Sequence, residues 1–265
     1  MRDIPAFSVS ADELIGFANH LADLAGAAIR PHFRQRIDIE AKGDDSPVTI
    51  ADRAAEAAMR QAIEAKYPAH GIYGEEYGHA RPDAPWQWIL DPIDGTKSFV
   101  TGLPIFGTLI ALTFEGQPVL GVIDQPNMRD RWVGASGRAT IFNGMATRAN
   151  PRSDLAKAAV ATTSVGLFNT AEAMAFETLR KACWLNRLSG DCIVFGLIAS
   201  GFVDVVVESR VQPYDYAALI PVVEGAGGVI TDWEGRPLDT RNPARVLAAA
   251  NPALHAAAQT YLSGA

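Results

Sequence analysis

Trp86-Gln-Trp-Ile-Leu-Asp-Pro-Ile-Asp-Gly-Thr96 is an apolar run that ends in two carboxylates, a glycine and a threonine. Ile89 and Leu90 are typical of the end of a buried strand. Asp91 and Asp94 are then expected at the carboxyl edge of that strand. Carboxylates this close together repel each other unless a proton or a cation lies between them. The stretch therefore predicts a site for a hard divalent cation such as Mg²⁺, which prefers oxygen ligands and keeps waters for a substrate phosphate.

The composition excludes several classes of protein. With 265 residues, 48% of them apolar and 20% charged, the chain is expected to bury a substantial core. Its net charge of −7 argues against a general nucleic-acid binder, which would carry a basic stripe. No stretch approaches the roughly 18 consecutive apolar residues of a membrane-spanning helix. A small-molecule substrate is therefore favoured over nucleic acid or membrane as a partner.

The N-terminus and the cysteines indicate a cytoplasmic setting. Residues 1–5 lack the basic and then apolar pattern of a signal peptide. Cys183 and Cys192 are the only cysteines, too few for a disulfide framework and wrongly spaced for a zinc knuckle. A reducing compartment is the simplest interpretation. Whether the two thiols touch stays open.

Periodicity predicts two helices before the central motif. Residues 11–30 place apolar side chains at the spacing of an amphipathic helix, with Pro31 near its end. Thr49 and Asp52 resemble a capping box, so a second helix is expected to begin there. After the motif, residues 105–142 are rich in β-forming residues and predict a hairpin and further strands.

The composition shifts at residues 150–154, where strands and helices begin to alternate. This pattern predicts an α+β half over residues 1–150, with most of the candidate ligands, and an α/β half over residues 151–265. The two halves would pack as one compact unit. Asp215, which follows a proline and precedes a predicted helix, is the late acidic candidate. By capping preference alone it is more often a helix N-cap than a metal ligand.

Three separated motifs resemble the signature of the inositol monophosphatase-like phosphatases. They are Gly74-Glu75, Asp91-Pro-Ile-Asp-Gly-Thr96, and Tyr214-Asp215 before a Gly-Ala-Gly-Gly turn. They occur in the family's order, and the resemblance spans residues 42–250. It implies a layered αβαβα fold and a magnesium-dependent, lithium-sensitive phosphomonoester hydrolase. It also implies a homodimer, whose interface we expect in the β-rich run.

Within that family the chain is most similar to the histidinol-phosphate phosphatases. The supporting stretches are residues 101–112, 121–126, 189–192 and 212–228. Related members hydrolyse inositol phosphates, sugar phosphates or nucleotide 3′-phosphates, so inositol 1-phosphate or a broad substrate range is the alternative. A catalytically silent regulatory homologue is a more remote one. Arg210 departs from the pattern, because a small residue is expected there, and this departure concerns substrate contacts.

The resemblance implies two to three Mg²⁺ ions in each active site. Glu75, Asp91 and the backbone carbonyl of Ile93 would hold the first ion. Asp91, Asp94 and Asp215 would hold the second, with Asp91 bridging the two. A third, weaker ion would contact Glu75 through waters.

The same resemblance assigns roles around the metals. Thr96, polarised by Asp52, would orient the attacking water together with Glu75. The backbone N–H groups of Gly95 and Thr96 would open a helix on which the phosphate rests. Lys42 would position its own loop or the third metal site.

Substrate recognition is expected from Arg187, Asp191 and Glu208. Histidinol phosphate carries an amine and an imidazole with an ordinary pKa of about 6.5, so two carboxylates would suit its cationic organic part. Asp191 has an alternative structural role, since it could cap the helix that follows Gly190.

Overall fold

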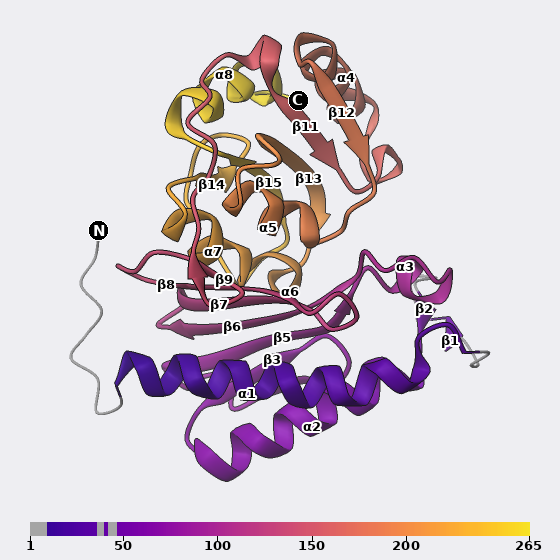
Figure 1. Cartoon of the computed structure of the whole chain (residues 1–265), viewed down its shortest axis with the longest axis vertical. Helices are drawn as coiled ribbons and strands as arrows, with labels where there is room; N and C mark the ends of the chain where they lie inside the picture. The colour runs from indigo at the N-terminus through magenta and orange to yellow at the C-terminus, as the bar shows by residue number, and fades with distance from the viewer. Residues whose placement is uncertain (1–9, 36–39, 42–46) are drawn as a thin grey trace.

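The structure, a computed structural model, describes residues 10–35, 40–41 and 47–265. Lys42 lies outside the described residues. The elements stack in five layers: two long helices, a sheet, a layer of short helices, a second sheet and two outer helices (Figure 1). The αβαβα fold implied by the resemblance is therefore confirmed.

The first layer consists of α1 (Ala11–Ile29) and α2 (Ile50–Lys66). Helix α1 buries an apolar face that includes Leu14, Phe17 and Leu21 against the first sheet and α2. Burying each such side chain contributes about 1.5–3 kcal/mol. The predicted capping box at the start of α2 is confirmed. At the end of α1, Pro31 lies in a short 3₁₀ turn, η1 (Arg30–His32).

The first sheet has eight strands in the order β10-β9-β8-β7-β6-β5-β3-β4. Only β3 and β5 pair in parallel, and the predicted hairpin of β6 and β7 is confirmed. Strand β5 continues beyond Leu90 to Asp94, with a register shift between Asp91 and Asp94. The strands are β3 (Gly71–Gly74), β4 (Gly78–Ala80), β5 (Trp86–Asp94), β6 (Gly107–Phe114), β7 (Gln117–Gln125), β8 (Asp130–Ala135), β9 (Ile141–Phe142) and β10 (Met145–Ala146), and a separate pair is β1 (Glu40–Ala41) with β2 (Pro47–Val48).

Short helices separate this sheet from the second one. They are α5 (Ile193–Ala199), α6 (Pro213–Tyr216) and α7 (Leu219–Gly225). Helix α7 contacts β7 and β8 on one side and β14 on the other. A shared apolar core therefore joins the second sheet to the inner face of the first.

The second sheet has five strands in the order β12-β11-β13-β15-β14. They are β11 (Ala159–Thr162), β12 (Leu185–Leu188), β13 (Val205–Val211), β14 (Val229–Asp232) and β15 (Ala244–Ala249). Helices α4 (Thr170–Ala182) and α8 (Pro252–Leu262) cover its outer face (Figure 1). The remaining turns are η2 (Leu155–Lys157) and η3 (Val165–Leu167), and α3 (Thr96–Val100) follows β5. The division at residue 150 stays a prediction.

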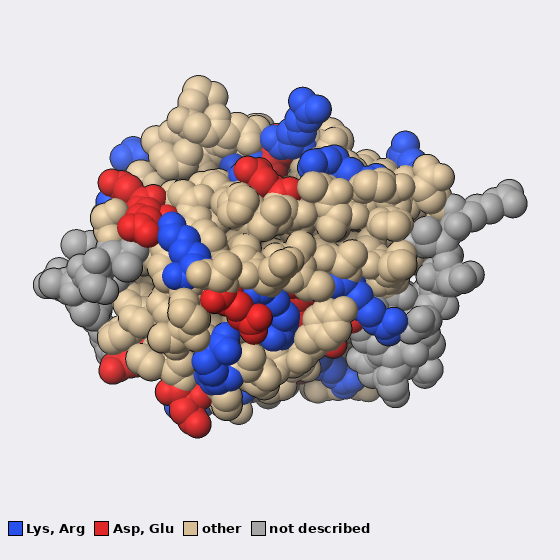
Figure 2. Space-filling view, turned by 90° about the horizontal axis from the view of Figure 1, so that it is seen from below, with Lys and Arg blue, Asp and Glu red and all other residues tan. Residues whose placement is uncertain are grey.

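The outer face formed by α1 and α2 carries charges of both signs (Figure 2). Lysine and arginine alternate with aspartate and glutamate over the described part of this face, without a continuous basic stripe. Among the described helices, none is both long enough and apolar enough to cross a membrane.

Candidate active site

Three carboxylates meet between the two sheets. Asp91 and Asp94 come from the carboxyl end of β5, and Asp215 comes from α6. One oxygen atom from each of the three lies within 4.8 Å of the others. The register shift in β5 matters here, because alternation along a regular strand would place residues 91 and 94 on opposite faces. The structure brings three of the predicted ligands together, and their role in holding a metal stays a prediction.

Burial and mutual repulsion disfavour the ionised forms of these carboxylates. Burial raises the pKa of Asp91 well above its ordinary value, and the charges of Glu75, Asp94 and Asp215 raise it further. Burial also raises the pKa of Asp94 to about 7, with Asp191 as a second cause. The pKa of Asp215 is raised well above normal for the same kind of reason. A divalent cation would remove this repulsion.

The residues present fit a magnesium ion. Their side chains offer oxygen atoms alone, the ligand type that Mg²⁺ prefers. Oδ1 of Asp91 is buried and has no hydrogen-bond partner among the described residues, as expected of an atom built to coordinate. The backbone N–H of Glu75 donates to the carbonyl of Leu90 at 3.1 Å, which ties Glu75 to the same strand end. The carbonyl of Ile93 accepts a hydrogen bond from Thr96 Oγ1 at 3.1 Å.

Backbone N–H groups hold two of the carboxylates in place. Asp94 Oδ2 accepts from the N–H of Cys192 at 2.5 Å, just before α5. Asp215 Oδ2 accepts from the N–H of Gln212 at 2.7 Å. Asp215 is the third residue of α6 and Gln212 is the N-cap, so the alternative of Asp215 as N-cap is wrong. Its capping contact coexists with its place in the carboxylate cluster.

Position 95 requires glycine for two reasons: its backbone is left-handed, and a side chain there would clash with Asp191. It is the N-cap of α3 with a φ of 88°, a left-handed conformation that favours glycine. A Cβ atom at this position would lie 2.6 Å from Asp191 Oδ2. Asp191 is itself held by a hydrogen bond of 2.7 Å from Ser98 Oγ. The predicted helix start at Gly95 and Thr96 is therefore confirmed, and it lies directly beside Asp191.

Thr96 and Asp52 form their hydrogen bonds with other residues and not with each other. Thr96 Oγ1 donates to Ile93, whereas Asp52 Oδ2 accepts from the N–H of Thr49 at 2.9 Å and from its hydroxyl at 2.5 Å. The other oxygen, Oδ1, is buried without a partner among the described residues. Burial raises the pKa of Asp52 to about 6, against the lowering effect of the Thr49 hydrogen bonds. Polarisation of Thr96 by Asp52 stays a prediction.

A cavity of about 210 Å³ adjoins the carboxylate cluster. Asp94 and Asp215 line it together with Asp191 and Glu208, two of the three predicted substrate residues. The third, Arg187, is exposed on edge strand β12 and is not among the residues that line this cavity.

The two substrate carboxylates have defined environments. Glu208 is buried and accepts from the N–H of Thr163 at 2.6 Å, and burial raises its pKa to about 8. Asp191 does not cap α5, because the N-cap is Cys192 and the Asp191 side chain turns to Ser98. The structural alternative for Asp191 is therefore wrong. Both thiols are free, and that of Cys192 is buried.

Glu56 on α2 is a positioning residue that the sequence analysis missed. It is fully buried, and its carboxylate accepts from the N–H of Glu76 at 2.7 Å and from that of Tyr77 at 3.2 Å. Arg60 completes the group with a 2.7 Å contact to Glu56. These bonds hold the turn that follows Glu75. An isolated glutamate in an amphipathic helix gives no sequence signal for such a role.

Comparisons with known proteins find related sequences and a similar fold. The sequence profile described as the inositol monophosphatase family matches residues 10–263. The chain is 49% identical over 229 residues to the chloroplastic bifunctional phosphatase IMPL2 of Arabidopsis thaliana, covering 85% of this chain and 66% of that protein. It is 38% identical over 221 residues to a histidinol-phosphatase of Chlorobaculum parvum, covering 83% and 85%. A solved inositol monophosphatase from Zymomonas mobilis superposes with a TM-score of 0.88 at 45% identity, covering 96% and 99%.

Proposed function

The chain belongs to the inositol monophosphatase family of phosphatases, and on that premise we propose that it is a Mg²⁺-dependent phosphomonoester hydrolase acting on histidinol phosphate. The observation that carries the proposal is a metal-type carboxylate cluster whose adjoining cavity contains two further carboxylates. Relatives called histidinol-phosphatases, at 35–38% identity, support this substrate. We place the reaction in cytoplasmic histidine biosynthesis.

The proposed metal ligands are the three clustered carboxylates together with Glu75 and the Ile93 carbonyl, which the family resemblance adds. Glu75, Asp91 and the Ile93 carbonyl would hold one ion, and Asp91, Asp94 and Asp215 would hold a second. Bound there, Mg²⁺ neutralises the phosphate and lowers the pKa of a coordinated water. A third, weaker ion beside Glu75 remains part of the proposal.

The residues around the ions would position the reactants. The N–H groups of Gly95 and Thr96 open α3, and the phosphate would lie against them because no side chain projects from Gly95. Thr96 and Glu75 would orient the attacking water, and Asp52 would support Thr96. In the present geometry the Thr96 hydroxyl donates to Ile93, so we expect it to turn away from that carbonyl when Ile93 binds a metal.

The organic part of the substrate would lie against Asp191 and Glu208. Burial favours the neutral form of Glu208, and an ammonium or imidazolium beside it would favour the ionised form instead. A neutral inositol ring would bring no positive charge to Glu208 and Asp191. Two acids at this place therefore favour a cationic substrate over a polyol.

A substrate panel tests the proposal directly. We expect the highest kcat/KM for histidinol phosphate among histidinol phosphate, inositol 1-phosphate and a hexose phosphate, and loss of all activity in EDTA. The substitution Glu208→Gln should lower kcat/KM for histidinol phosphate about tenfold or more, while inositol 1-phosphate changes by less than about threefold. A preference for inositol 1-phosphate, or equal losses on both substrates, would contradict the assignment.

A second activity on inositol or sugar phosphates is the alternative that one comparison favours. The relative at 49% identity is called a bifunctional phosphatase, although the chain spans only 66% of its length. In that case the panel would show two substrates with kcat/KM values within about tenfold of each other.

We also propose a homodimer formed through residues 105–142, which light scattering on the purified protein would test.

A further inference from the structure

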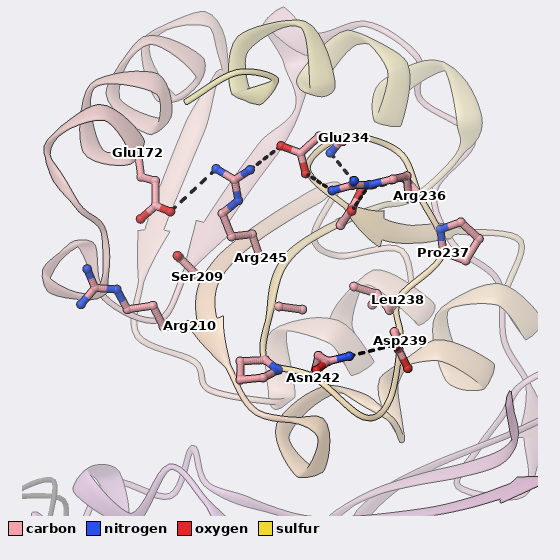
Figure 3. Close-up of a pocket in the computed structure, with 13 residues that line it drawn as sticks. Glu172, Ser209, Arg210, Glu234, Arg236, Pro237, Leu238, Asp239, Asn242 and Arg245 are labelled. Carbon is pink, nitrogen blue, oxygen red and sulfur yellow. Dashed lines mark hydrogen bonds and ion pairs between the residues drawn. The ribbon is translucent and has the colours of Figure 1, made fainter. Parts of the chain in front are cut away.

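A second and larger pocket lies in the C-terminal part of the molecule. It has a volume of about 540 Å³ and lies between β13, β15 and the loop that follows β14 (Figure 3). None of the predicted metal ligands lines it. Three of its residues, Glu172, Ser209 and Arg210, lie on the same side of the pocket in the view of Figure 3.

Strand β13 separates this pocket from the substrate cavity. Glu208 lines the substrate cavity, and Ser209, the next residue, lines the second pocket. Ser209 is 1% exposed, and its Oγ has no hydrogen-bond partner among the described residues. A buried hydroxyl without a partner costs about 1–3 kcal/mol, so a ligand atom that pairs with it would bind more favourably. Arg210 follows and lines both cavities.

Most charges in the second pocket neutralise each other. Arg236 contacts Asp232 at 2.7 Å, and Arg245 contacts Glu234. One acidic side chain, Glu172, and one basic side chain, Arg210, are incompletely paired among the described residues. Glu172 Oε2 caps α4, and its Oε1 lies 3.9 Å from a nitrogen of Arg245, with no closer ion-pair partner among the described residues.

Arg210 is the basic side chain that lacks an ion-pair partner among the described residues. It is exposed and forms no ion pair within the described part of the chain. It has a φ of 60° at the register shift between Glu208 and Val211, a conformation that is costly for a residue other than glycine. Such strain is more often kept at functional positions than elsewhere.

We propose that this pocket binds a small zwitterion, a free α-amino acid, which regulates the phosphatase. Its ammonium group would contact Glu172, its carboxylate would contact Arg210, and the Ser209 hydroxyl would complete the site. Four acidic side chains and three arginines line the pocket, and one of the acids, Asp239, pairs with Arg241 outside it, so the remaining charges balance and a ligand without net charge suits them. Because Arg210 also lines the substrate cavity, a ligand that holds it removes a positive charge from beside Asp191 and Glu208, where we placed the cationic organic part of the substrate. On the proposed function, the KM for histidinol phosphate should therefore fall.

Calorimetric titration of the Mg²⁺-loaded full chain with each free amino acid tests the binding. Acetate and ethylamine serve as probes that carry only one of the two charges. We expect at least one amino acid to bind while neither probe does. The substitutions Ser209→Ala, Glu172→Gln and Arg210→Gln should each weaken that binding about tenfold or more. Glutamine keeps the capping role of Glu172, since it is also favoured at that helix position.

The control is Arg148→Gln, an exposed arginine that lines a different pocket and should leave binding unchanged. At a concentration near its Kd, the bound amino acid should lower the KM for histidinol phosphate about fivefold or more in the unmodified enzyme and have a much smaller effect in Ser209→Ala, whose basal kinetics stay normal. The proposal is overturned if no amino acid binds at about 10 mM, which would nearly fill a site with a Kd of about 1 mM. It is also overturned if acetate or ethylamine binds equally well, if the three variants bind normally, or if KM does not change. The calorimetric readouts do not depend on which phosphomonoester is the natural substrate, so they can fail or succeed independently of the proposed function.

Discussion

Single residues decide whether the carboxylate cluster works, and Asp94 offers the sharpest test. Asp94→Asn should lower kcat about 100-fold or more, because a neutral amide is a poor ligand for Mg²⁺. The fold should survive, since the Asn oxygen can still accept the hydrogen bond that the N–H of Cys192 donates. In EDTA the variant should be more heat-stable than the unmodified protein, because one repelling charge is gone. Steady-state kinetics and thermal melting measure both effects, and full activity would contradict the two-metal scheme.

Glu56 provides the second prediction at this scale. Glu56→Gln should lower the free energy of unfolding by about 1–3 kcal/mol, because one carboxylate oxygen that accepts from a backbone N–H becomes a donor. The turn after Glu75 should loosen, so a higher Mg²⁺ concentration should be needed for half-maximal activity. Denaturant unfolding and magnesium titration are the measurements. Glu64→Gln, an exposed position on the same helix, is the matched control and should change neither value.

The sequence predicts the residues of the cluster better than their partners. Asp91 and Asp94 stand out because a buried strand rarely ends in two acids. The contact between Asp52 and Thr49 is local and could be predicted as a capping box. By contrast, the contacts of Asp94 with Cys192 and of Asp191 with Ser98 join residues that are 98 and 93 positions apart, and no local pattern encodes them.

At the scale of elements, periodicity predicts the amphipathic helices and the central hairpin. It does not predict β12, because Leu185–Leu188 is a short edge strand whose exposed residues include an arginine. The sequence pattern also predicts that β5 ends at Leu90, too early, because the proline and two acids that follow resemble a loop more than a strand. Pairing with β6 carries this strand on to Asp94. Tertiary pairing thus overrides local preference at the place where the site is built.

The junction between β5 and α3 carries the third prediction. Gly95→Ala should lower kcat about tenfold or more, because the new methyl group would displace Asp191 and the start of α3. Gly137→Ala is a matched control: it has a similar φ of 74°, but nothing lies within 4 Å of the new Cβ. In both variants a left-handed alanine should lower the free energy of unfolding by about 1–2 kcal/mol. Only Gly95→Ala should lose activity, and equal activity in the two variants would show that space at Gly95 is unimportant.

At the scale of the whole molecule, the site exists because three distant segments meet between two sheets. Periodicity predicts an α+β half and an α/β half, but it does not predict that α5, α6 and α7 lie between them. The layered arrangement was expected only from the family resemblance. Asp215 reaches the end of β5 because α6 packs against β5 and β6. A buried site assembled in this way stores charge repulsion in the fold.

That repulsion predicts how stability depends on pH and metal. Asp94, with a pKa of about 7, and Glu208, with a pKa of about 8, both lie above their ordinary values of 3.8 and 4.5. The folded state therefore binds more protons than the unfolded state between those limits, so the stability of the metal-free protein should fall as the pH rises from about 5 to 8. Groups with lowered pKa, such as Glu177 at about 2, act only at more acidic pH.

Mg²⁺ should reverse this trend, because it binds the ionised carboxylates of the folded state and not the unfolded chain. The increase in Tm on adding Mg²⁺ should therefore be larger at pH 8 than at pH 5. Thermal melts in EDTA and in Mg²⁺ across this range, with Na⁺ at matched ionic strength as the control, measure the effect. A metal-free Tm that rises steadily with pH would show that the buried carboxylates are already compensated by the protein itself. The cation would then be needed for the reaction alone and not for holding the carboxylates of β5 and α6 together.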